Sequence, residues 1–273
     1  MIQIKILIEN TVFQPDVCAE HGLAIYLKTR DHTLLFDAGQ TEGFLRNSSV
    51  FGTPLEEIEK IIISHGHYDH CGGLLPLLEK NTRAEVYCKE EALIPKFSDT
   101  YQEKRQINLP LIHAYKKHPS RFCFVKENHE LFPGVWIISH IIQKTKFEND
   151  DAKLYCLSEN QFIKDPFDDE IFLLIEDDNQ LHLITGCSHR GIINMIHTAT
   201  ILFPGKSIKS VTGGFHLRNK DEQRIQLVAK YLNESQIEQI NVCHCTGIEE
   251  YLVIKKIFRG KTSYLSTGML VKL

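Results

Sequence analysis

The densest group of potential metal ligands in this chain is His65, His67, Asp69 and His70, four side chains within six residues. They follow the apolar run at 61–63. That run is short and β-branched and is soon followed by glycine, which predicts a buried strand. The ligands are therefore expected on a loop at the carboxyl end of that strand, because a helix or strand of this length could not turn all four inward.

Imidazole nitrogens and a carboxylate suit a borderline divalent cation such as zinc. His65 and His67, two residues apart, can bind one cation, and Asp69 and His70 can bind a second beside it. The alternative is a histidine-rich surface loop without function, and that alternative does not account for the ligand spacing.

Three further histidines follow apolar runs that also predict strands: His189, His216 and His244. Sites in open α/β architectures gather at the carboxyl ends of strands, so these loops are expected to converge with residues 65–70. For His189 and His244 the alternative is an ordinary histidine near a helix start. For His216 the alternatives are a metal ligand in place of His244 and a hydrogen bond to substrate.

Alternating patterns along the rest of the chain predict an α/β fold, with two layers of sheet covered by helices. The first strands are expected to pair antiparallel, and the residues around Asn179 to turn a hairpin. Strands are expected at 2–8, 23–29, 33–36, 61–64, 84–88, 122–126, 135–139, 171–176, 181–185, 208–212, 237–242 and 263–272. Helices are expected at 41–51, from 53 onward, and at 72–80, 192–202, 222–233 and 247–258.

No repeat or linker is evident, so one domain is expected over residues 1–273, with an irregular insertion of helix and loop at about 89–120 covering the site. The net charge of −4 offers no basic footprint for nucleic acid. No signal peptide and no run of about 18 apolar residues is present, so no membrane partner is expected. The eight cysteines form no C-x-x-C pair, which indicates reduced thiols and a cytoplasmic protein. The oligomeric state is left open.

The motif at 65–70 resembles the H-x-H-x-D-H metal signature of the metallo-β-lactamase superfamily, and residues 36–39 resemble its upstream D-x-G turn. Within the superfamily, the chain is most similar to the subfamily of dihydropterin–ribofuranosylaminobenzene phosphate synthase and related metal-dependent hydrolases. The similar segments are 20–23, 64–70, 165–170, 185–189, 213–217 and 244–247.

This resemblance implies an αββα sandwich and two metal sites. One site would take His65, His67 and a third ligand, for which His189 is expected. The other would take Asp69, His70 and a late histidine, for which His244 is expected.

Two neighbours of these ligands are also expected to contribute. Cys187 stands where the superfamily usually has a bridging aspartate, and it is either a ligand or a buried turn cysteine. Asp37 is expected to accept a ring N–H from a ligating histidine, the alternative being a solvated turn aspartate.

Two divalent cations are expected, zinc first, with manganese or iron as alternatives. Di-iron relatives carry glutamate where this chain has His67, which favours zinc and hydrolysis. Asp69 and His216 are the expected catalytic residues, and His21 and Arg190 the expected substrate contacts, each with an ordinary surface residue as its alternative.

The chain is therefore expected to be a dinuclear metallohydrolase of a small phosphorylated or ester-type substrate, with a metal-bound hydroxide as nucleophile. One alternative is a transferase that condenses a pterin diphosphate with an arylamine ribofuranosyl phosphate. The other is a metal-dependent sensor without turnover.

Overall fold

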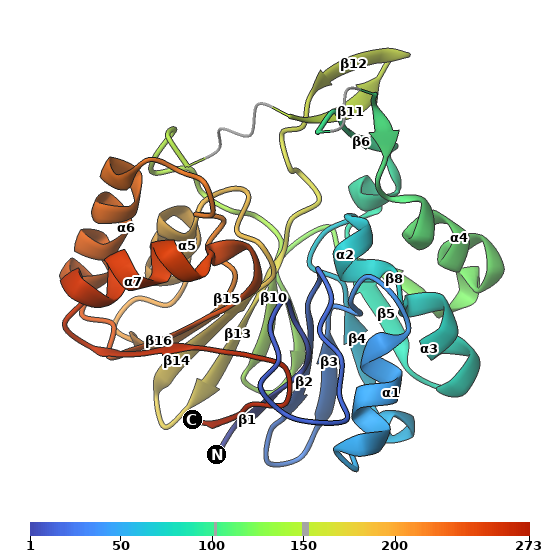
Figure 1. The fold of residues 1–273 in the computed structure, drawn as a ribbon, viewed down its shortest axis with the longest axis horizontal. Coiled ribbons are helices and arrows are strands. Elements are labelled where there is room, and N and C mark those ends of the chain that lie inside the picture. Colours follow the sequence, from blue (N-terminus) through green and yellow to red (C-terminus); the bar gives the residue numbers. More distant parts are fainter. Residues whose placement is uncertain (101–102, 149–152) are drawn as a thin grey trace. The chain divides into compact units, whose positions relative to one another are not determined.

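A computed structural model describes residues 1–100, 103–148 and 153–273 of this chain. The chain divides into two compact units. Unit 1 comprises Met1–Lys126, Asp151–Glu170 and Ser266–Leu273, and unit 2 comprises Glu127–Asp150 and Ile171–Leu265. Figure 1 labels many of the elements of both units, and its colours follow the chain from residue 1 to residue 273.

Unit 1 contains a seven-stranded sheet in the order β18-β1-β2-β3-β4-β5-β8. Strands β1, β2 and β3 pair antiparallel, as predicted, and β3, β4, β5 and β8 pair parallel. The strands are β1 (Gln3–Ile8), β2 (Ala24–Lys28), β3 (Thr33–Phe36), β4 (Lys60–Ile62), β5 (Glu85–Cys88), β8 (Phe122–Phe124) and β18 (Leu270–Lys272). Its α-helices are α1 (Gly43–Val50), α2 (Tyr68–Cys71), α3 (Leu74–Lys80) and α4 (Leu109–Lys117).

A small antiparallel sheet, sheet C, also belongs to unit 1, in the order β12-β11-β6-β7. Its strands are β6 (Lys96–Ser98), β7 (Arg105–Gln106), β11 (Leu154–Ser158) and β12 (Gln161–Lys164). The expectation of only helix and loop at 89–120 was wrong for β6 and β7; residues 101–102 lie outside the described part. These strands are only two or three residues long. Strand β6 also pairs with a strand more than 50 residues away, so no local sequence pattern predicts them.

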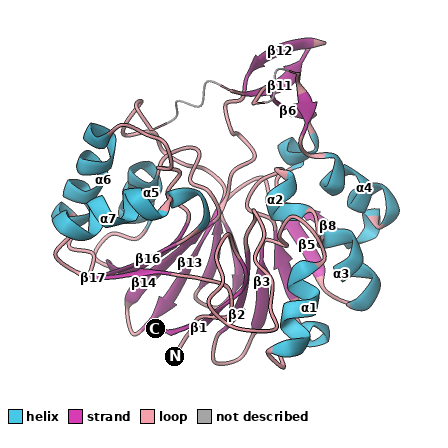
Figure 2. Ribbon diagram, viewed as in Figure 1, coloured by secondary structure: helices cyan, strands magenta, loops and turns pink. Residues whose placement is uncertain are grey.

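Unit 2 contains the second seven-stranded sheet, in the order β17-β16-β15-β14-β13-β10-β9. Its strands are β9 (His129–Phe132), β10 (Val135–Ile138), β13 (Phe172–Asp177), β14 (Gln180–Thr185), β15 (Ser207–Gly213), β16 (Gln239–Val242) and β17 (Lys261–Tyr264). The helices α5 (Ile192–Leu202), α6 (Glu222–Glu234) and α7 (Ile248–Ile257) connect its parallel strands, and Figure 2 shows them in cyan. The predicted hairpin joins β13 to β14, with Asp178 and Asn179 both at positive φ.

Two other predicted elements were wrong in extent. The strand expected at 263–272 is two strands in different sheets, β17 and β18, because the chain turns at Gly268, whose φ is 90°. The helix expected from 53 is a 3₁₀ helix of three residues, Leu55–Glu57, since Ile58 is already extended toward β4. Strands β9, β11 and β12 had not been expected.

None of the eight cysteines forms a disulfide in the described ranges. No helix in the described ranges is long and apolar enough to cross a membrane.

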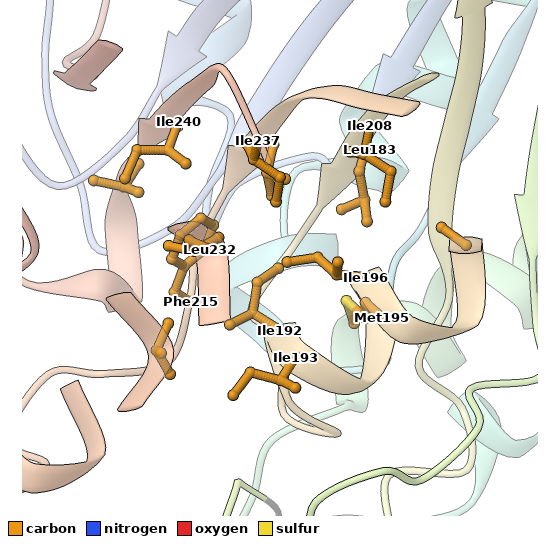
Figure 3. Close-up of a cluster of buried hydrophobic side chains, with 14 of the residues drawn as sticks. Leu183, Ile192, Ile193, Met195, Ile196, Ile208, Phe215, Leu232, Ile237 and Ile240 are labelled. Atoms are coloured by element: carbon orange, nitrogen blue, oxygen red, sulfur yellow. The ribbon is translucent and has the colours of Figure 1, made fainter. Parts of the chain in front are cut away.

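The core of unit 2 lies between its sheet and helices α5, α6 and α7. Figure 3 shows Leu183 of β14 and Ile240 of β16 in the same cluster of buried side chains as Ile192 and Ile196 of α5. All four side chains have no exposed area. Helix α5 is apolar on most of its circumference because it packs on β15 and also against α6.

Replacing Leu183 by alanine should lower the free energy of unfolding by about 2–5 kcal/mol, since a cavity remains where the side chain packed. Leu252→Ala is the matched control, because Leu252 lies on α7 and is 49% exposed. Denaturant titration of both variants checks this, and equal midpoints would contradict the assigned core.

Candidate metal centre

The parallel pairing of β3 and β4 brings Asp37 next to the histidine motif. Phe36 pairs with Ile62, so both strands end at the same edge of the sheet. The Asp37 N–H then donates to the Ile62 carbonyl at 2.8 Å. Asp37 has a φ of 60°, a left-handed conformation that aspartate tolerates better than most residues.

The four ligand side chains of the motif do not all lie on a loop. His65 and His67 precede α2, whereas Asp69 and His70 lie within this single helical turn, so the expectation of a loop was wrong for these two. Asp69 stands in the first turn, where the helix dipole favours a negative charge. The turn packs tightly on residue 40: a Cβ at Gly72 would meet the Gln40 carbonyl oxygen at 1.9 Å.

Three buried imidazole rings meet at the motif. The centroid of the His65 ring lies 4.4 Å from that of His67 and 4.3 Å from that of His70. Burial lowers the pKa of His67 to about 4, and burial together with the charges of His70 and His67 lowers the pKa of His65 well below its ordinary value. Both rings are therefore neutral near pH 7, the state in which imidazole ligates a metal.

Asp37 orients one of these rings. Its Oδ2 lies 2.6 Å from Nδ1 of His70, and both groups are fully buried. The Ser64 N–H and hydroxyl donate to the same carboxylate at 2.7 and 2.8 Å. The contact expected between Asp37 and a histidine of the motif is therefore present, and a proton held on Nδ1 leaves Nε2 of His70 as a lone-pair donor.

The exposed rim of the motif carries His21. Its Nε2 lies 3.2 Å from Oδ2 of Asp69, and the His21 side chain is 47% exposed. Next to it, Glu20 accepts the backbone N–H groups of Gln40 and Thr41, which fixes the segment before β2. His21 thus contacts both the Asp69 carboxylate of the motif and the surrounding solvent.

A buried ion cluster of Lys96, Asp165 and Asp169 contacts the backbone of the motif. Lys96 Nζ lies 2.8 Å from Asp165 Oδ2 and 2.9 Å from Asp169 Oδ1. The other oxygen of Asp169 accepts the N–H of Gly66, between two of the histidines, at 2.8 Å. Burial alone would lower the pKa of Lys96, but the charges of Asp169 and Asp165 raise it, so the cation persists. The resemblance of the acidic segment 165–170 thus has a structural basis here.

Unit 2 places its candidate residues at the ends of three adjacent parallel strands. Thr185 of β14 pairs with Gly213 of β15, which pairs with Val242 of β16. The loops that follow β14 and β15 carry the expected residues Cys187, His189 and His216. After β16, the expected residue His244 begins a 3₁₀ helix, His244–Thr246. The Ser188 hydroxyl ties two of these loops by donating to the Gly214 carbonyl at 2.7 Å.

Cys187 belongs to two potential ligand groups within unit 2. One group consists of Cys187, His189 and His216, and the other of Cys187, His244 and Cys245; within each, the ligand atoms lie within 4.8 Å of one another. The ring centroids of His189 and His216 are 4.3 Å apart. His216 and His244 both have positive φ, and such backbone conformations gather at functional sites.

Cys245 is a candidate that the sequence reasoning missed. Burial would raise the pKa of its thiol, but hydrogen bonds with Cys187 and His216 and the charge of His244 hold that pKa well below its ordinary value. The sequence signal for Cys245 is its position next to His244. A search for C-x-x-C pairs does not detect this signal, because Cys245 belongs to no such pair.

Arg190, an expected substrate contact, is half-buried in unit 2. One guanidinium nitrogen lies 3.4 Å from the Ile141 carbonyl oxygen, and the Arg190 carbonyl accepts a hydrogen bond from the Asn194 side chain. The Arg190 side chain therefore has a hydrogen-bond partner within unit 2, in addition to its expected role as a substrate contact.

The donor sets fit divalent metals. Unit 1 offers neutral, oriented imidazoles beside a carboxylate, and unit 2 offers imidazoles and thiols. Nitrogen, sulfur and carboxylate donors suit zinc and similar ions. A single centre built from both sets stays a prediction of the sequence.

Residues 19–187 match the model of the metallo-beta-lactamase superfamily. The chain belongs to the metallo-β-lactamase superfamily. Its α/β fold of the metallo-β-lactamase type is thereby confirmed. Among solved structures, Tm1679, a metal-dependent hydrolase of the beta-lactamase superfamily, is similar with a TM-score of 0.87 and 29% identity, covering 100% of this chain and 99% of that one.

Two proteins of Methanocaldococcus jannaschii are similar to this chain along nearly their whole length. The chain is 30% identical to the uncharacterized protein MJ0448 of Methanocaldococcus jannaschii, covering 90% of this chain and 91% of that protein. It is 27% identical to the 7,8-dihydropterin-6-methyl-4-(beta-D-ribofuranosyl)-aminobenzene-5'-phosphate synthase of the same organism, covering 93% and 90%. The resemblance to the synthase subfamily is thus confirmed.

Replacing Asp37 by asparagine should weaken zinc binding about 10- to 100-fold, because the amide orients the His70 ring less firmly than the carboxylate does. Asp31→Asn, in an exposed turn, is the control. Competition with a chromogenic chelator measures the affinity. Unchanged affinity in Asp37→Asn would show that the contact does not tune the site.

Replacing Lys96 by methionine should lower the free energy of unfolding by about 3–5 kcal/mol, because two carboxylates stay buried without their cation. Lys117→Met, which removes an exposed ion pair with Glu79, should change stability far less. Urea titration compares the two, and similar losses would argue against the buried cluster.

Proposed function

We propose that this protein is a dinuclear metal-dependent hydrolase of a small phosphorylated or ester-type substrate. The observation that carries the proposal is the trio of buried imidazoles at the motif, of which His65 and His67 are neutral near pH 7 and His70 is oriented by Asp37. The similarity to Tm1679, a metal-dependent hydrolase, supports the same reaction class.

The proposed ligands are those expected from the sequence: His65, His67 and His189 for one cation, and Asp69, His70 and His244 for the other. When bound, two divalent cations supply Lewis acidity and bring the pKa of water close to neutrality. Cys187 and Cys245 are further candidate ligands from unit 2.

Three side chains of the chain are proposed to orient the attacking water and to transfer protons. Asp69 is proposed to orient the attacking water. His21, 3.2 Å from Asp69 and partly exposed, is suited to exchange protons between that carboxylate and solvent. In the hydrolysis, the water oxygen bonds to the phosphorus or carbonyl carbon, the bond to the leaving oxygen breaks, and His216 is proposed to return a proton to it.

A second candidate function is group transfer, favoured by the 27% identity to the dihydropterin synthase over 93% of this chain. Here an arylamine would replace water as the nucleophile on a pterin diphosphate, and diphosphate would leave. Incubating the enzyme with the pterin diphosphate, with and without the amine, separates the two. Coupled product only when both are present supports transfer, and release of diphosphate without amine supports hydrolysis.

The metal assignment is tested by alanine variants of three histidines. His189→Ala and His244→Ala should each lose about one metal ion per chain and reduce turnover at least a hundredfold, because a lost ligand leaves an open, poorly shaped site. His216→Ala should keep both metals and lose turnover alone.

Elemental analysis of the purified variants, and anomalous scattering from their crystals, measure this outcome. If His216→Ala loses a metal while His244→Ala keeps both, the last ligand belongs to the loop of His216. A wild-type chain that stays active after complete removal of metal would overturn the proposed function.

A further inference from the structure

Sheet C turns one face toward the metal motif. Arg105 of β7 pairs with Ser98 of β6, and Lys96 stands two residues before Ser98. Side chains on a strand alternate between faces, so Lys96, Ser98 and Arg105 share one face of this sheet. Lys96 on that face reaches Asp169, which holds the N–H of Gly66.

The two cations on this face have different surroundings. Lys96 is 2% exposed and neutralised by two carboxylates. Arg105 is exposed, and within the described part of the chain no carboxylate forms an ion pair with it. Its charge is therefore available to a ligand.

The guanidinium of Arg105 lies on a residue of the motif itself. Its central carbon is 5.2 Å from the centroid of the Tyr68 ring, a cation–π contact. Tyr68 stands between His67 and Asp69, and its ring centroid is 6.4 Å from that of His21. Arg105 is thus held beside the ligands on the solvent side of the motif.

We propose that Arg105 is the anion-binding residue of the substrate site and selects a phosphate-bearing substrate. This inference rests on the proposed function and narrows its substrate class from esters in general to phosphate esters. The cation–π contact with Tyr68 restrains the guanidinium next to the motif. A guanidinium can donate two parallel hydrogen bonds to phosphate oxygens, whereas a lysine carries the charge but lacks the paired donors.

The opposite face of sheet C provides a matched control. Lys164 of β12 lies over the Tyr155 ring, with Nζ 4.2 Å from its centroid, and it donates to the Tyr155 hydroxyl at 3.0 Å. Tyr155 pairs with both Phe97 and Lys164, and Phe97 alternates with Lys96, so these residues face away from Arg105. Lys164→Ala removes one positive charge from the same sheet without touching the proposed site.

The experiment compares Arg105→Ala, Arg105→Lys and Lys164→Ala with wild type, all zinc-loaded. Calorimetry measures the binding of inorganic phosphate, and kinetics use p-nitrophenyl phosphate and the uncharged ester p-nitrophenyl acetate. Arg105→Ala should weaken phosphate binding and raise KM for the phosphate ester about tenfold or more, because a charge-assisted pair is lost. Hydrolysis of the acetate, zinc content and the Lys164→Ala values should match wild type, and Arg105→Lys should recover part of the loss.

Equal phosphate binding by Arg105→Ala and Lys164→Ala, or no phosphate binding by wild type, would overturn the inference. Equal losses on the phosphate and acetate esters, or loss of zinc in Arg105→Ala, would also overturn it by showing a structural role. If wild type binds phosphate through Arg105 yet hydrolyses neither ester, the inference stands and the proposed hydrolase function fails.

Discussion

The motif depends on one buried carboxylate, that of Asp37. It lies at the end of β3 and receives hydrogen bonds from Ser64 at the end of β4 and from the His70 ring. A carboxylate buried at 0% exposure is costly unless its oxygens are satisfied, so the two strand ends and the histidine must stay together. The parallel pairing of β3 with β4 supplies that arrangement. The Asp37 side chain thus connects the ends of two strands of the unit 1 sheet with the His70 ring.

A second constraint is the buried ion cluster of Lys96, Asp165 and Asp169. One lysine on a three-residue strand forms ion pairs with two carboxylates from a distant segment, and the second oxygen of Asp169 accepts a hydrogen bond from the N–H of Gly66. Such a cluster contributes little net stability, because desolvation of the charges offsets their attraction. The cluster instead positions the motif. Its Asp169 restrains Gly66, between His65 and His67, while Asp37 restrains the His70 ring.

The sequence predicted the parts of the site whose signal is local. The ligand spacing at 65–70, the apolar runs before each histidine and the hairpin at Asn179 all lie within a few residues of one another. What it missed depends on partners far along the chain. The sequence around Lys96 does not indicate its ion pairs with Asp165 and Asp169. Strands β6 and β7 are too short to show an alternation of apolar and polar residues. The helical turn at Asp69 and the position of Cys245 beside other potential ligands depend on tertiary packing in the same way.

Strand β18 has a consequence for how this sheet is completed. In β18, Lys272 pairs with Gln3 of β1, so the edge strand of the sheet of unit 1 comes from residues far along the chain. During synthesis the edge of β1 therefore stays open until residues 270–272 have been made and have left the ribosome. An open edge of this kind can pair with other chains. Disrupting β18 should thus favour aggregation of newly made chains, even though residues 270–272 carry none of the metal-motif side chains.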